Sequence, residues 1–210
     1  MLKQLPLRFR QHYNLKILGV PKQLLGVEIK WGENFKTVHI SIRKLIVQLL
    51  TQTGMLNCTP VPTPMIPGQR FTKEDTPDPK LVKKDKKFKE MQKRYRQIVG
   101  TFIFICHTCR PDIVYMVNVL CRAMANPSMK HMEAAKHGLR YLAGTADAGI
   151  TYTYDGNRKP DMLGDADNGA DWTCRICICN MLRLAGALIY WMVKLLKEFA
   201  LSTCEAEIRS

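Results

Sequence analysis

Residues 94–145 read RYRQIVGTFIFICHTCRPDIVYMVNVLCRAMANPSMKHMEAAKHGLRYLAGT, and apolar side chains recur through them at helical spacing. Three runs of this kind, which begin near Phe88, Ile113 and Met132, each place their large side chains on one face. Arg110-Pro111-Asp112 separates the first run from the second, and a proline suits a first helical turn. The stretch therefore predicts three amphipathic helices packed into a small bundle. Arg110 is expected to pair with Asp112 or with a phosphate, and a structural role at the helix junction is favoured.

Strand-like patterns flank this bundle on both sides. Five stretches have the alternation or the short apolar run typical of strands: residues 24–30, 37–41, 149–154, 161–167 and 188–193. A further helix is predicted over residues 45–50, with Gly54 as its stop signal. These patterns together predict an α+β chain.

A proline-rich segment separates the first of these elements from the bundle. Four of the eight residues from Pro60 to Pro67 are prolines, which excludes a regular helix or a central strand. Together with the lysines that follow, the segment predicts an extended, mobile linker over residues 57–87. An SH3-type ligand at PVPTP is the alternative, and the linker is favoured.

Short motifs stand at fixed offsets along the helical stretch. They are Tyr95-Arg96, Val99-Gly100, Arg110-Pro111-Asp112-Ile113, Tyr115, Val117-Asn118, Pro127, His131, Ala134-Ala135-Lys136, Leu139-Arg140-Tyr141-Leu142 and Gly144-Thr145. Their order and spacing resemble the copia-type LTR retrotransposon Pol polyprotein, in the segment that joins the reverse transcriptase to the ribonuclease H domain. Upstream, LGVEI at residues 25–29 and the Cys58, Pro60-Val61 and Thr63-Pro64-Met65 series resemble further motifs of that family.

The resemblance implies a division of the chain into four parts. Residues 1–56 would end a reverse transcriptase palm/thumb-like segment, 57–87 would be the Pro/Lys-rich linker, 88–145 a helical connection segment and 146–210 a truncated ribonuclease H-like domain. The implied fold class is α+β, with a helical thumb- or connection-like segment and an incomplete ribonuclease H-like mixed sheet.

The same resemblance supplies candidate catalytic residues near the C-terminus. Asp165-Ala166-Asp167, Asp171 and Arg175 fit the start of the family's ribonuclease H, and Glu205-Ala206-Glu207 fits its first helix. Asp165 and Glu207 would then be vestigial ribonuclease H carboxylates, which in the intact family would hold Mg²⁺. From the residues alone, an Asp-rich polar turn is the favoured interpretation of this cluster.

Two features weaken the expectation of catalysis by this chain alone. The sequence contains no adjacent Asp pair, and metal-dependent phosphoryl transfer by a polymerase needs clustered carboxylates. Asn168 and residues 176–181 depart from the family pattern, with Asn180 in place of a glycine. We therefore expect a fragment or degenerate relic that is inactive by itself and binds no metal ion.

Positive charge dominates the composition. The net charge is +14, and between Lys80 and Arg96 nine Lys or Arg stand against two acidic residues. A solvated helix face and linker would explain this. The alternative is a basic module that binds RNA, DNA or their hybrid without sequence preference, through phosphate contacts. The candidate binding residues are Lys83, Lys84, Lys86, Lys87, Lys93, Arg94 and Arg96.

Cysteine content and hydropathy bear on the cellular setting. Eight cysteines without a signal peptide predict free thiols and an intracellular protein of the cytoplasm or nucleus. Cys106 and Cys109 invite a zinc site, but their place in an apolar helix disfavours it. The apolar run at residues 181–193 is too short for a membrane span and suits a pair of strands. No membrane partner is expected, and the pattern leaves the oligomeric state open.

Overall fold

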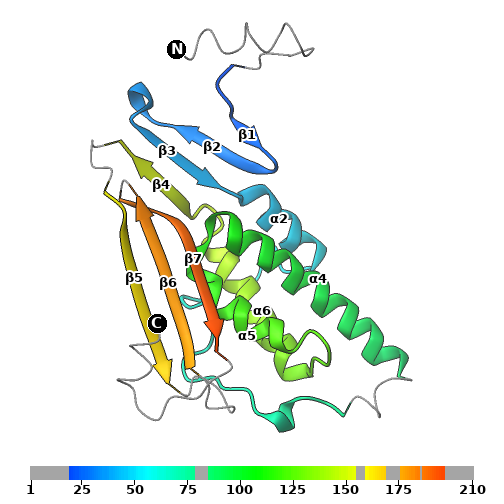
Figure 1. The fold of residues 1–210 in the computed structure, drawn as a ribbon. Coiled ribbons are helices and arrows are strands. Elements are labelled where there is room, and N and C mark those ends of the chain that lie inside the picture. The colour runs from blue at the N-terminus through cyan, green and yellow to red at the C-terminus, as the bar shows by residue number, and fades with distance from the viewer. Residues whose placement is uncertain (1–18, 79–84, 155–158, 169–175, 185, 197–210) are drawn as a thin grey trace, which may run out of the picture.

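The computed structural model of the chain describes residues 19–78, 85–154, 159–168, 176–184 and 186–196. Within them, helices lie beside two antiparallel sheets, so the architecture is α+β as predicted (Figure 1). The elements are β1 (Gln23–Leu24), β2 (Val27–Trp31), η1 (Glu33–Phe35), β3 (Thr37–Ser41), α2 (Arg43–Gln52), η2 (Lys73–Asp75), α4 (Lys86–Cys109), η3 (Pro111–Ile113), α5 (Val114–Arg122), α6 (Met129–Gly144), β4 (Gly149–Thr153), β5 (Asp161–Asn168), β6 (Ile176–Leu184) and β7 (Ala187–Leu195).

The three predicted amphipathic helices are confirmed as α4, α5 and α6. Tyr95 and Phe102 on α4, Leu120 on α5 and Leu139 on α6 are fully buried in one core, which the predicted faces create. Pro111 occupies the start of the short 3-10 turn η3, as its fixed φ favours. Helix α2, also predicted, packs into the same core and is followed by Gly54 at φ +70°.

The first sheet has the strand order β1-β2-β3-β4. The prediction of one continuous strand over residues 24–30 is wrong, because Leu25 and Gly26 have φ values of +50° and +86° and turn the chain between β1 and β2. The predicted strands at 37–41 and 149–154 are confirmed as β3 and β4, which pair along their whole length. The sheet therefore joins both sides of the helical segment.

The second sheet has the order β5-β6-β7, and both of its pairings are antiparallel. A mixed sheet was predicted, whereas the described strands contain no parallel pair. The apolar run at residues 181–193 lies in β6 and β7, as predicted, and no helix among the described residues has the length and apolar content to cross a bilayer.

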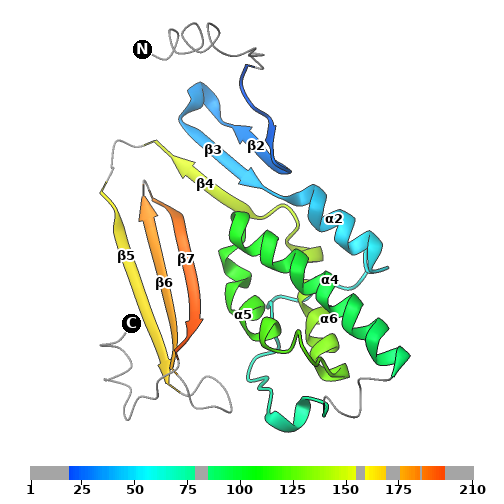
Figure 2. The same ribbon diagram turned by 45° about the vertical axis from the view of Figure 1, so that its right-hand side comes forward.

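Strand β7 fastens the second sheet to the helices (Figure 2). Trp191 Nε1 donates to the Cys106 carbonyl of α4 at 3.1 Å, and Asn118 Nδ2 of α5 donates to the Val193 carbonyl at 2.9 Å. The Tyr152 hydroxyl of β4 donates to the Leu188 carbonyl at 2.9 Å. Through Ala187 and Trp191 the sheet contributes to the helical core, while Ile176 and Ile178 of β6 form a second, smaller cluster with Ala166, Met192 and Leu196.

Residues 60–67 form no regular helix or strand, as the prolines predict, and residues 57–76, which we call the strap, contact α6. The strap runs along α6, where Arg140 Nε donates to the Thr59 carbonyl at 2.7 Å and His137 Nε2 lies 3.0 Å from the Thr63 carbonyl. Pro60 lies so close to Gly144 that a Cβ there would stand 2.8 Å from its ring. Backbone carbonyls that face polar helix side chains hold this segment in place.

Candidate nucleic-acid interface

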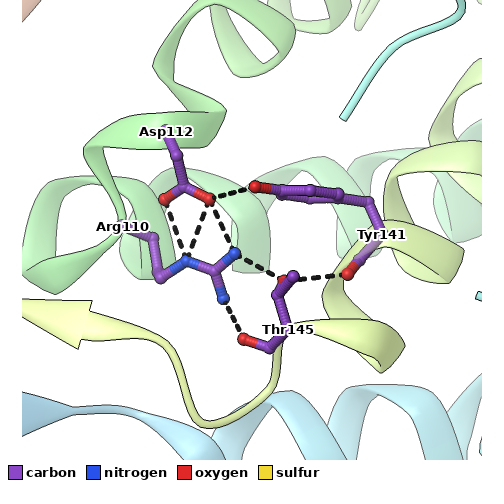
Figure 3. Close-up of polar contacts among 4 residues, drawn as sticks. All are labelled: Arg110, Asp112, Tyr141 and Thr145. Atoms are coloured by element: carbon purple, nitrogen blue, oxygen red, sulfur yellow. Dashed lines mark hydrogen bonds and ion pairs between the residues drawn. The ribbon is translucent and has the colours of Figure 1, made fainter. Parts of the chain in front are cut away.

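A buried ionic cluster fixes the end of α4 relative to α6 (Figure 3). Arg110 follows α4, is only 1% exposed, and donates to the Asp112 carboxylate at 2.7–3.2 Å. Its guanidinium also donates to the carbonyl and the hydroxyl of Thr145, both at 2.7 Å. Tyr141 on α6 donates its hydroxyl to Asp112 at 2.8 Å. The predicted pairing of Arg110 with Asp112 is confirmed.

The charges of this cluster stabilise each other against the cost of burial. Burial acts to raise the pKa of Asp112, but hydrogen bonds from Arg110 and Tyr141 outweigh it and the pKa lies below its ordinary value. Burial acts to lower the pKa of Arg110, and Asp112 reverses that shift, so the guanidinium stays charged. Because Arg110 donates its hydrogen bonds to Asp112 and Thr145, its role is structural: it connects the end of α4 to the end of α6.

The outward face of α4 is rich in exposed cations. Asp85 caps the helix by accepting a hydrogen bond from the Lys87 amide at 2.8 Å. Glu90 is the one acidic residue between Lys86 and Arg96. The exposed cations of this part of α4 are Lys86, Lys87, Lys89, Lys93, Arg94 and Arg96.

The placement of these cations is not explained by the needs of the helix. Positive charge near a helix N-terminus is unfavourable, because the backbone dipole is positive there, and α4 has no acidic residue in its first turn. None of the lysines on α4 forms an ion pair with another described residue. Their ammonium groups therefore face solvent, with Asp85 and Glu90 as the nearby acidic residues in the sequence of the helix.

The cationic face continues into a line of uncharged residues. Lys93, Gln97, Gly100 and Phe104 follow one another at spacings of three or four residues, so they share one side of α4. Gly100 is exposed in mid-helix, where a Cβ would meet no other atom within 4 Å, and Phe104 is 48% exposed. A bare backbone beside an exposed ring allows another molecule to approach the helix closely.

Three of the residues predicted to bind nucleic acid do not add to the solvent-facing lysines described above. Arg96 Nε donates to the Met124 carbonyl at 2.8 Å and so helps hold the loop after α5, although its side chain remains exposed. Lys83 and Lys84 lie outside the described residues. Lys89, Gly100 and Phe104 were missed by the sequence interpretation, although their helical spacing from Lys86 and Lys93 would have placed them on this face.

Only one of the two predicted ribonuclease H carboxylates lies in the described part of the chain. Asp165 is exposed on β5, opposite Cys179 of β6, while Glu207 lies outside the described residues. The described residues contain no group of three or more potential ligands that could hold a metal ion. The Mg²⁺ site that the resemblance implies needs Glu207 beside Asp165, so it stays a prediction.

The cysteine pair on α4 is buried. Burial raises the pKa of Cys106 to about 12 and that of Cys109 to about 11, so both thiols are protonated at neutral pH. Both lie fully within the core formed by the helices and β7. These cysteines act as small apolar core residues in the structure.

Comparison with known proteins relates the whole chain to transposon proteins. The "Retrovirus-related Pol polyprotein from transposon TNT 1-94" of Nicotiana tabacum is 32% identical over 93% of this chain and 14% of its own length. The corresponding polyprotein from transposon RE1 of Arabidopsis thaliana is 34% identical over 95% of this chain and 13% of its own length. An uncharacterized mitochondrial protein of Arabidopsis thaliana is 27% identical over 100% of this chain and 82% of its own length.

No protein-family model and no solved structure matches the chain. The relatives at 32–34% identity are transposon-encoded Pol polyproteins. The chain is homologous to a short part of the retrovirus-related Pol polyproteins of copia-type transposons. It spans about one-seventh of the length of these polyproteins, 14% in the tobacco relative.

Proposed function

We propose that the chain is the part of a copia-type Pol polyprotein that joins its reverse transcriptase to its ribonuclease H, and that α4 holds nucleic acid there. The observation that carries this proposal is the exposed, predominantly cationic face of α4, continued by Gly100 and Phe104. Lysines that face solvent along one side of a helix can neutralise successive phosphates, while a bare helix backbone admits the sugar-phosphate chain.

The arrangement supports binding without sequence preference. Phosphate contacts position a protein on nucleic acid but carry no direct sequence information. Gln97 and Phe104 add a hydrogen-bonding group and an apolar ring on the same face, where a base edge or sugar can contact them. RNA, DNA and RNA–DNA hybrid all present the phosphate pattern that the lysines recognise.

The test replaces Lys86, Lys89 and Lys93 together with Gln and measures binding of a labelled RNA–DNA hybrid across a range of salt. Three phosphates would then go without a neutralising lysine, which should lower the affinity and reduce the salt slope by about 0.9 for each of them. The matched control replaces Lys22, Lys30 and Lys36, which are exposed near the first sheet, and removes the same charge.

Equal losses in the two triple variants would mean that only net charge matters, and the α4 proposal would fail. A second comparison uses Gly100→Leu, which adds no charge and fills open space. Weaker binding by this variant, with unchanged helix content, would place the nucleic acid against the backbone of α4.

We further propose that the chain alone catalyses neither primer extension nor hybrid cleavage. Support comes from the lack of an adjacent Asp pair and from Asp165 standing without companion ligands among the described residues. The buried Asn180 oxygen on β6, which has no hydrogen-bond partner, is consistent with a relic, because it occupies a position where the family pattern has Gly. Assays of the chain beside Asp165→Asn decide the matter: cleavage that the substitution abolishes would show a working site.

A further inference from the structure

A buried histidine caps the N-terminus of α6 in the described structure. Ser128 is the N-cap residue, and its hydroxyl lies 2.7 Å from Nδ1 of His131. The Ser128 backbone amide donates to the same Nδ1 at 3.2 Å. His131 thus takes the place that Glu or Gln holds in a capping box, and it is only 3% exposed. A ring nitrogen that accepts this amide hydrogen bond must be unprotonated.

The same imidazole supports the strap. Phe71 stacks on it with ring centroids 4.4 Å apart and the planes inclined by 13°. The Lys130 ammonium also lies against Phe71, 5.8 Å from its ring centroid, and pairs with Asp75 at 2.9 Å. Asp75 in turn accepts the Thr72 amide at 2.7 Å and closes the turn η2. These contacts fasten one end of the strap to the first turn of α6.

We infer that His131, Phe71 and Asp75 form an acid-sensitive latch, whose opening releases the strap from the start of α6. Protonated Nδ1 becomes a donor and can no longer accept the Ser128 amide. The new positive charge would also stand at a helix N-terminus, where the backbone dipole opposes it. Protonation would therefore destabilise the position of His131, and with it the stacking of Phe71 on the imidazole ring.

The two charged groups near His131 shift its pKa in opposite directions. Burial lowers the pKa of His131, the Asp75 carboxylate acts to raise it, and the Lys130 ammonium acts to lower it. The net pKa lies below the ordinary 6.5, so the open state binds the proton more tightly than the closed state. The latch is therefore complete above pH 6.5 and weakens as the pH falls below that value.

The measurement is amide hydrogen exchange of the full 210-residue chain at pH 7.5 and pH 5.0, corrected for intrinsic rates. Amides of residues 72–76 and of the first turn of α6 should lose protection at pH 5.0, by at most about thirtyfold. This limit follows because the ordinary pKa of His131 in the open state, 6.5, lies 1.5 units above pH 5.0. Amides in the middle of α4 should keep their protection. The His131 ring resonances should titrate together with the amides of the strap.

Two variants separate the groups that could cause the change. His131→Gln makes the ordinary Ser-x-x-Gln capping box, which keeps the cap and removes the titration, so its strap should show no acid response. Asp75→Asn removes the other titrating group and should leave an acid response in place. An unchanged strap in the wild-type chain at pH 5.0, or an equal response in His131→Gln with its helix content intact, would refute the latch.

Discussion

Arg110 shows how a single charged residue is kept almost wholly out of water. Its guanidinium is 1% exposed and is surrounded by the Asp112 carboxylate and by the carbonyl and hydroxyl of Thr145. Removal of one member of such a pair leaves a buried charge without its partner, which costs far more than the pair itself contributes. The cluster therefore makes the α4–α5 junction intolerant of change.

Substitution of Asp112 by Ala should destabilise the chain by about 1–3 kcal/mol, because the buried Arg110 guanidinium loses a carboxylate that is itself 36% exposed, while it keeps its bonds to Thr145. Urea unfolding followed by circular dichroism measures the loss. The matched control is Asp161→Ala, which breaks the pair with Arg183 on the second sheet, where the two side chains are 53% and 42% exposed. The control should change stability little, since water screens exposed pairs. Similar losses in both variants would contradict the role given to burial.

The sequence predicted part of this cluster and could not predict the rest. Arg110 and Asp112 are two positions apart, and the proline between them signals a turn that brings them together. Thr145 is 35 positions from Arg110, and no local pattern indicates that α6 ends beside α4. The contacts of the strap with α6 were not predicted for a similar reason, because their partners, such as Thr59 with Arg140 and Phe71 with His131, are far apart in the sequence.

Among the elements, α4 combines an inward face that sets its position with an outward face that carries the proposed function. Helical periodicity predicted its apolar face correctly, and its length of 24 residues follows from the cap at Asp85 and the break at Pro111. The prediction of one strand over residues 24–30 was wrong because Leu25-Gly26 forms a turn with positive φ values. An Asn-Gly pair is a recognised sequence signal for such a turn, and a Leu-Gly pair is not.

The two helical glycines offer a paired prediction about α4 and α6. Gly100→Ala should raise the free energy of unfolding by up to about 1 kcal/mol, because alanine favours the helix and its methyl group meets open space. Gly138→Ala should lower it, because a Cβ there would stand 2.5 Å from Met116 Sδ and 3.3 Å from the Phe102 ring. Thermal unfolding compares the two. A destabilised Gly100→Ala variant would show that the exposed face of α4 is already occupied within the chain.

At the scale of the whole molecule, the larger of the two hydrophobic clusters of the described residues runs from α2 to β7. Ile42 and Trp191 both belong to it, although the motif resemblance assigned them to different parts of the chain. The division at residue 146 has no counterpart in the first sheet, where β4 pairs with β3. Local patterns could not predict this, because sheet pairing between distant segments depends on the path of the chain between them.

Trp191→Ala should loosen the second sheet as well as lower stability, by about 3–5 kcal/mol for the loss of a large core side chain. Hydrogen exchange should show reduced protection of β6 and β7, with a smaller change in the centre of α4. Trp31→Ala is the control, since that ring is 40% exposed on the first sheet. Loss of protection confined to β1 and β2 in both variants would contradict the anchoring role of Trp191.

The pairing of β3 with β4 also has a consequence during synthesis on the ribosome. His39 and Thr151 face each other across this pairing but are 112 positions apart. Translation adds about 5–20 residues per second, so β4 is synthesised on the order of ten seconds after β3. Until then the edge of β3 that pairs with β4 has no partner strand. During that interval the nascent chain presents an unpaired strand edge to other chains, which makes this the stage at which a chaperone would have the greatest effect on yield.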